Sequence, residues 1–118
     1  MNNENEINFF IKTGQDYQKN NDYFGAYSNF KKAFRLSNNI KILFVMIDLV
    51  FHSQKSGLLV NQSLKYILLK NLIGYGFKNN QNQIFFKQLC FYKLKLYREF
   101  RYFKEFKKYY ESNKSLIL

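Results

Sequence analysis

The chain has 118 residues, of which 47% are hydrophobic and 20% aromatic, and it carries a formal net charge of +11 and one cysteine. So many core-forming residues exclude a disordered chain, and the single cysteine excludes an internal disulfide and a cysteine-based zinc site. From the length we expect one domain, residues 1–118.

The positive charge has two explanations. A strongly basic protein typically binds nucleic acid or another anionic surface. However, lysine outnumbers arginine 16 to 3, and Phe, Tyr, Met, Ile, Asn and Lys make up 66 of the 118 residues. A strongly AT-rich genome produces this composition whatever the protein does, so the total charge alone does not indicate the partner.

The first helical hairpin is predicted over residues 6–37. Apolar residues recur at intervals of three and four between Phe9 and Tyr17, and again between Phe24 and Phe34, which places them on one face of each of two helices. Asn20–Asp22 separates the two helices, and Asp22 is a good N-cap for the second.

The second hairpin is predicted over residues 40–73. Its first helix, Ile40–Gln54, is apolar on most sides and is expected to be buried. Asp48 interrupts it, and a paired acid on the helix surface is favoured over a ligand site. The turn is expected at Ser56–Gly57 and the second helix over Leu58–Ile73. The core side of that second helix is expected to consist of Leu64, Ile67 and Leu68. The apolar run is too short to span a bilayer.

The clearest loop is predicted at Gly74–Gly76 and Asn79–Asn80. The basic, aromatic segment that follows, about residues 82–113, contains no Gly or Pro to mark a turn. It is predicted to be either a third hairpin bent near Tyr97 or one long helix, and the sequence favours neither.

Large and small side chains alternate at fixed spacing in the first hairpin: Phe10, Gly14, Tyr17, Ala26, Phe30 and Ala33. In this pattern the segment resembles a tetratricopeptide (TPR) repeat, whose period is about 34 residues. The small residues let two helices approach closely, and the large ones fill the space beside that contact. One period later Phe44, Asp48, Phe51, Val60, Leu64 and Ile67 keep the large positions and lose the small ones. This TPR register would direct Asp48 to the contact between helices. In the last segment Phe85, Phe91 and Phe100 fit only with extra residues around Gly74–Asn80.

The resemblance implies an all-α fold, a short TPR-like solenoid of two to three antiparallel helical hairpins, and a non-enzymatic binding scaffold. Many TPR proteins hold the C-terminal carboxylate of chaperone peptides with a lysine and an asparagine. The corresponding positions here are Ile11, Gln15 and Met46, so a chaperone peptide is not expected as partner. Another peptide would bind in the concave groove near Asn8, Gln15 and Met46.

No catalytic, metal or cofactor site is expected. His52 is the only histidine and Cys90 the only cysteine, and a cysteine in an apolar helix is usually an inert buried thiol. The stretch GYGFKNN lacks the spacing of a phosphate-binding loop.

The most informative functional segment is Lys87–Lys114, which has eight cations and two acids between Lys87 and Lys108. As a helix it would be cationic on one side, with Arg101, Lys104 and Lys108, and aromatic on the other, with Phe103, Phe106 and Tyr110. Three interpretations remain open: a core-facing helix with a solvated lysine face, a surface that docks on RNA or an acidic partner, and a membrane-surface helix, which is the least expected. The residues expected to contact RNA or an acidic partner are Arg98, Arg101, Tyr102, Lys104, Lys107, Lys108 and Tyr109.

The favoured interpretation is a structural subunit of a large ribonucleoprotein assembly such as an organellar ribosome. Its partners would be neighbouring protein subunits and ribosomal RNA, because a short solenoid without polar end caps needs its ends covered. The N-terminal MNNENEI is unlike a secretory signal or an arginine-rich transit peptide. We therefore expect a mitochondrial or other organellar location if an organelle genome encodes the chain, and a cytoplasmic one otherwise. A free TPR-type peptide-binding module and an accessory subunit of another organellar complex are the alternatives.

Overall fold

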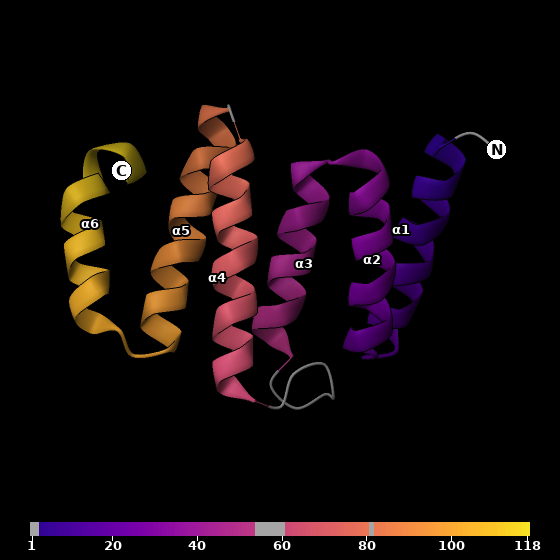
Figure 1. Cartoon of the computed structure of the whole chain (residues 1–118), viewed down its shortest axis with the longest axis horizontal. Helices are drawn as coiled ribbons and strands as arrows, with labels where there is room; N and C mark the ends of the chain where they lie inside the picture. The colour runs from indigo at the N-terminus through magenta and orange to yellow at the C-terminus, as the bar shows by residue number, and fades with distance from the viewer. Residues whose placement is uncertain (1–2, 54–60, 81) are drawn as a thin grey trace. The chain divides into compact units, whose positions relative to one another are not determined.

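The computed structural model describes residues 3–53, 61–80 and 82–118, and all the regular structure in these ranges is helical (Figure 1). The prediction of an all-α fold is therefore confirmed. The sequence predicted one domain, whereas the contacts divide the chain into two compact units, residues 1–65 and 66–118. The helices are α1 (Asn3–Lys19), α2 (Tyr23–Ser37), α3 (Ile40–His52), α4 (Gln62–Asn79), α5 (Gln83–Glu99) and α6 (Phe103–Ile117).

Helices α1 and α2 form the first predicted hairpin, and its turn is built from well-suited residues. Asn21 adopts the left-handed conformation (φ 59°), which asparagine tolerates better than most residues. The amide of Asp22 donates to the carbonyl oxygen of Tyr17 at 2.9 Å. The Asp22 side chain accepts from the amide of Gly25 at 2.9 Å, so the predicted N-cap is confirmed.

The two helices of this hairpin pack small residues against aromatic rings. Gly14 is buried, and a Cβ atom placed there would lie 2.9 Å from the ring of Phe30. At Gly25 a Cβ would lie 2.6 Å from the ring of Tyr17. Ala26 and Ala33 are fully buried. Close approach of α1 and α2 therefore depends on the absence of side chains at two glycines, of which sequence reasoning identified only Gly14.

Helix α3 begins at an asparagine pair and is buried along most of its length. Asn38 ends α2 in the left-handed conformation (φ 54°), and the Asn39 side chain caps α3 by accepting from the amide of Lys41 at 2.9 Å. Asp48 is exposed, as favoured for an acid on the helix surface, and the orientation toward the inter-helix contact that the TPR register implied was wrong. The acid lies on the one side of α3 that the neighbouring apolar side chains leave to solvent.

A buried lysine lies at the end of α3. Lys65, in the first turn of α4, is 2% exposed, and its Nζ atom donates to the carbonyl oxygen of Phe51 at 3.1 Å. Ser53, also buried, donates its hydroxyl to the carbonyl oxygen of Val50 at 2.8 Å. The last carbonyl groups of a helix lack helical partners and carry partial negative charge, so these donors stabilise the end of α3.

Helix α4 differs from its prediction at both ends and in its buried side. It begins at Gln62, after Asn61, whose side chain accepts from the amide of Ser63 at 2.8 Å; the turn expected at Ser56–Gly57 lies outside the described residues. It continues through Gly74–Gly76 to Asn79, so the loop predicted there was wrong. Glycine weakens a helix by about 1 kcal/mol relative to alanine and does not break it.

The buried side of α4 was also predicted wrongly. Leu64 and Ile67 are 54% and 51% exposed, whereas Leu69 and Ile73 are buried. Apolar residues occur all round this helix, so their spacing does not indicate one face. Asn80, the last residue of the predicted loop, lies outside α4, and Asn82 precedes α5 and accepts from the amide of Ile84 at 2.9 Å.

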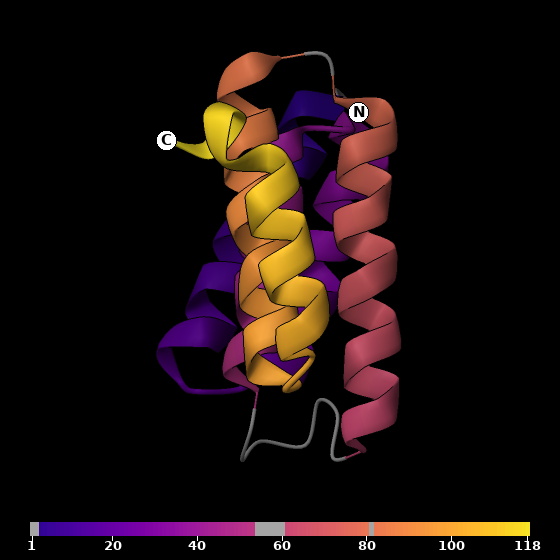
Figure 2. The ribbon, with the colours of Figure 1, turned by 90° about the vertical axis from the view of Figure 1, so that its left-hand side faces the viewer.

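The segment after this connection is a hairpin and not one long helix. Helices α5 and α6 run in opposite directions (Figures 1 and 2), and residues 100–102 join them, three positions beyond the predicted bend at Tyr97. Their lengths of 17 and 15 residues equal those of α1 and α2. Counted from the turn, Leu94, Phe106 and Asn113 replace the small residues Gly14, Ala26 and Ala33. Phe85, Phe91 and Phe100 do not occupy equivalent places, so that alignment was wrong.

Candidate nucleic-acid interface

The turn between α5 and α6 repeats two hydrogen bonds of the α1–α2 turn with different residues. The amide of Tyr102 donates to the carbonyl oxygen of Tyr97 at 2.7 Å, and the amide of Arg101 donates to that of Arg98 at 3.2 Å. Arg101 is in the left-handed conformation (φ 63°), which glycine or asparagine adopts at lower cost. Tyr102 is the N-cap of α6 and makes no capping hydrogen bond with its side chain.

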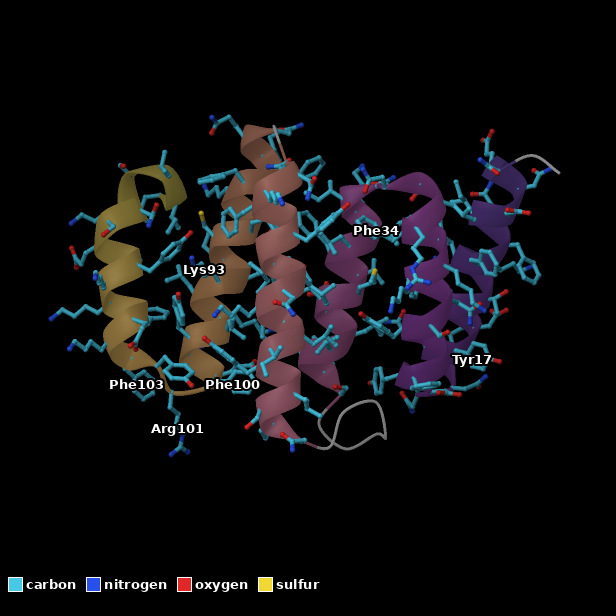
Figure 3. All side chains as sticks on the ribbon, viewed as in Figure 1. Tyr17, Phe34, Lys93, Phe100, Arg101 and Phe103 are labelled. Carbon is cyan, nitrogen blue, oxygen red and sulfur yellow. The ribbon has the colours of Figure 1, made fainter. Side chains whose placement is uncertain are left out.

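The predicted cations of this hairpin lie on its surface, and Figure 3 shows the side chain of Arg101 directed away from the turn. Lys114 and Glu111 form an ion pair at 3.5 Å. Within the described ranges, the predicted cations form no such pair. They are Arg98, Arg101, Lys104, Lys107 and Lys108, all exposed.

Aromatic rings surround the same turn. The ring of Tyr66, in α4, lies 5.2 Å from the ring of Phe100 and 5.2 Å from that of Tyr102. Phe103, which the sequence placed on the aromatic side of a helix, is 61% exposed. Cations and partly exposed rings therefore occur together at the α5–α6 turn, a combination that suits phosphates and unstacked bases.

Tyr109, which was predicted as a contact residue, is half-buried, and its hydroxyl is directed into the hairpin. Its hydroxyl donates to the Sγ atom of buried Cys90 at 3.3 Å, and the Nζ atom of Lys93 lies 4.6 Å from the centre of its ring. Burial and the Cys90 thiol raise the pKa of Tyr109. Phe106 and Tyr110 also pack against the cluster of Cys90, Leu94 and Ile117.

Of the three positions expected to line a peptide groove, two are exposed and one is buried in the structure. Asn8 and Gln15 are exposed on α1, but Met46 is buried in α3. Phe10 is half-buried, with the Nζ atom of Lys32 at 5.5 Å from the centre of its ring. Phe9 is 64% exposed, and a hollow of about 520 Å³ lies beside it, lined also by Asn5, Glu6 and Phe10.

The two residues considered for nucleophilic chemistry have local partners. Cys90 is buried beneath Tyr109, and the Nδ1 atom of His52 lies 2.7 Å from the carbonyl oxygen of Asp48 in the same helix. Across the described ranges, no three His, Cys, Asp or Glu side chains come together in a way that could hold a metal ion. Of the helices in those ranges, none is long and apolar enough to cross a bilayer.

Comparison of the chain with models of known protein families, with curated proteins and with solved structures found no match. The resemblance to TPR repeats therefore depends on the residues of the first hairpin themselves.

Proposed function

We propose that this protein is a non-enzymatic helical scaffold that binds RNA through its α5–α6 turn, as a structural subunit of a large ribonucleoprotein assembly. The observation that carries the proposal is the residue choice in that turn. The α1–α2 turn uses Asn21 and Asp22, which suit its geometry, and the α5–α6 turn has the same pattern of hydrogen bonds with Arg101 and Tyr102.

Arginine at a left-handed position and tyrosine at an uncapped N-cap both reduce local stability. Residues that conflict with their local geometry are most often found where function requires them. Both side chains are exposed, and both are of types that contact RNA, arginine through phosphates and base edges and tyrosine by stacking. AT-rich composition does not explain the arginine, because such a genome supplies lysine and two of the three arginines of the chain, Arg98 and Arg101, lie here.

The scaffold part of the proposal rests on the hairpins. Two hairpins of equal helix lengths, α1–α2 and α5–α6, are consistent with repeated units in a short TPR-like solenoid. A subunit of an organellar ribosome would explain the composition and the basicity. It would also explain the exposed apolar residues of each unit, among them Phe9 and Leu118, because neighbouring subunits would cover them. The corresponding location is the mitochondrion or another organelle.

Fractionation of the native particle tests this function. The protein, followed with an antibody in lysate of its own cells, should sediment with an RNA-containing particle at moderate salt and be released when nuclease digests the RNA. Monomeric protein that is free of RNA and has no affinity for polyanions would overturn the proposal.

A peptide-binding module is the second candidate, and the hollow beside Phe9 and Phe10 favours it. In that case the protein would copurify with one protein partner whether or not nuclease is present, and Phe9→Ala would abolish the association. Phe103→Ala, which removes an equally exposed ring from α6, is the matched control.

A further inference from the structure

A cavity lies between α4 and α5, within the unit of residues 66–118. Its volume is about 190 Å³, smaller than the 300–1,000 Å³ typical of pockets that enclose drug-sized ligands. A single planar ring system is therefore the largest ligand it suits. The residues that matter in its walls are three aromatic ones, Tyr66, Phe77 and Tyr97, two lysines, Lys70 and Lys93, and Gly74.

The cavity is continuous with the α5–α6 turn. Tyr66 lines the cavity and also contacts the rings of Phe100 and Tyr102, each at 5.2 Å between centroids. Tyr97 lines the cavity too, and its carbonyl oxygen accepts the hydrogen bond that closes the turn. An RNA strand whose phosphates contact Arg98 and Arg101 would therefore lie close to two of the residues that line the cavity.

The two lysines that line the cavity, Lys93 and Lys70, differ in their exposure to solvent. Figure 3 labels Lys93 on α5; its Nζ atom lies 5.8 Å from the ring centre of Phe77 and 4.6 Å from that of Tyr109, and its side chain is half-buried. Two ring faces thus hold this ammonium group by cation–π attraction. Lys70 is exposed. One fixed cation lies among the rings and one lies where solvent reaches it.

The hydroxyl groups of the two tyrosines remain donors at neutral pH. Burial is the main cause that raises the pKa of Tyr66, with Tyr102 contributing, and burial also raises that of Tyr97. The cavity thus combines aromatic surface with O–H and N–H donors, which match the ring faces and the carbonyl or ring-nitrogen acceptors of a nucleobase.

We propose that this cavity binds one unpaired base of a single-stranded RNA whose phosphates contact the α5–α6 turn. The inference rests on the proposed function and deepens it by naming the form of RNA. Aromatic side chains stack on bases of any sequence, and donors from Lys93 and the tyrosines would contact the edge of the base. A duplex offers no such base unless a pair is broken, so the protein should prefer single strands.

Filling the cavity tests the inference. Gly74 lines it, and a Cβ atom at this position meets nothing within 4 Å, so Gly74→Leu is designed to extend an apolar side chain from this wall without changing charge. Gly74→Ala, which adds one methyl group to the same helix, is the matched control. The probes are a 12-nucleotide oligouridine with a central 2-aminopurine, whose fluorescence falls on stacking, and an RNA duplex of 12 base pairs.

Wild type and Gly74→Ala should quench the 2-aminopurine and prefer the single strand. Gly74→Leu should lose the quenching and weaken single-strand binding by roughly tenfold, a loss of the size expected for one stacked base, while duplex binding stays unchanged. Unchanged duplex binding also shows that the variant is folded. Should it fail to fold, Tyr97→Leu, which removes one aromatic wall, should give the same loss.

If Gly74→Leu quenches 2-aminopurine and prefers the single strand as strongly as the wild type does, the inference is overturned. RNA binding by the α5–α6 turn would not be affected by that result. Failure of the wild type to bind either RNA would overturn the proposed function, and the inference with it.

Discussion

Hairpins α1–α2 and α5–α6 have the same helix lengths and share two backbone hydrogen bonds in their turns, but their residues differ in how well they suit these positions. In α1–α2, glycine and alanine let the helices approach and the turn residues are those that its geometry favours. In α5–α6, large side chains separate the helices, and an arginine and a tyrosine occupy the turn at a local cost. The first hairpin is explained by stability, whereas the second requires a further explanation, and binding supplies one.

The largest effect is expected where the first hairpin is tightest. Phe30→Ala should lower the free energy of unfolding by about 3–5 kcal/mol, because it leaves a cavity beside Gly14. Urea unfolding followed by circular dichroism measures this. Phe103→Ala, an exposed ring of the second hairpin, should change stability by no more than about 0.5 kcal/mol. Equal costs at the two positions would remove the contrast between the hairpins.

Two glycine-to-alanine substitutions test whether the tight packing of the first hairpin depends on the absence of a side chain. Gly14→Ala forces the Phe30 ring to move and should destabilise the protein by about 1–3 kcal/mol. Gly74→Ala adds a methyl group where nothing is near and should stabilise it by up to about 1 kcal/mol. Differential scanning calorimetry would show opposite shifts in melting temperature. Shifts of the same sign would mean that Gly14 is not a packing requirement.

Tyr109→Phe examines the interior of the second hairpin. Loss of the hydrogen bond to Cys90 should cost about 0.5–1.5 kcal/mol at neutral pH. The folded protein raises the pKa of Tyr109 above its ordinary value of 10.0. The contribution of this group is therefore complete below that pH and is lost as the pH rises further.

Measured from pH 8 to 11, the stability of the wild type should thus fall more steeply than that of Tyr109→Phe. Parallel curves would show that the hydroxyl is solvated in the folded state.

The smallest change in stability is expected in the turn itself. Arg101→Gly removes the cost of holding an arginine in the left-handed conformation, but glycine loses more backbone entropy on folding. The net gain in the free energy of unfolding should be about 0.5–1 kcal/mol. Asn21→Gly, the same replacement in the other turn, should gain less, because asparagine already tolerates this conformation. Thermal melts of both variants measure the difference. A loss of stability in Arg101→Gly would show that the arginine supports the fold.

The parts of the fold that the sequence predicted are those with local causes. Asp22 caps α2 through its own side chain, and Gly14, Ala26 and Ala33 are buried at the small positions of the repeat pattern. The errors arose where tertiary contacts decide. Leu64 and Ile67 were predicted to be buried but are exposed, because α4 has apolar residues on all its sides and their spacing does not indicate which side packs. Gly74 and Gly76 were predicted to form a loop but continue α4, because glycine weakens a helix without ending it.

The candidate site was predicted in part. Charge density indicated Arg98, Arg101 and Lys104, but the sequence has no signal for the turn at residues 100–102, because its left-handed residue is an arginine. Tyr109 was misplaced for the same reason, since on one long helix it would have been exposed. Lys65 and Lys93 were missed altogether, because only the fold shows which of the 16 lysines are buried or half-buried.

The salt dependence of RNA binding tests the central claim most directly. Each phosphate contact with a single strand contributes about 0.7 to the slope of log affinity against log salt concentration. Replacing Arg98, Arg101 and Lys104 by glutamine should therefore reduce the slope for oligouridine by about 2. Replacing exposed Lys12, Lys19 and Lys31 of the first hairpin removes the same charge and should leave the slope unchanged. Equal reductions in the two triple variants would contradict the account, because binding would then follow net charge and not the α5–α6 turn.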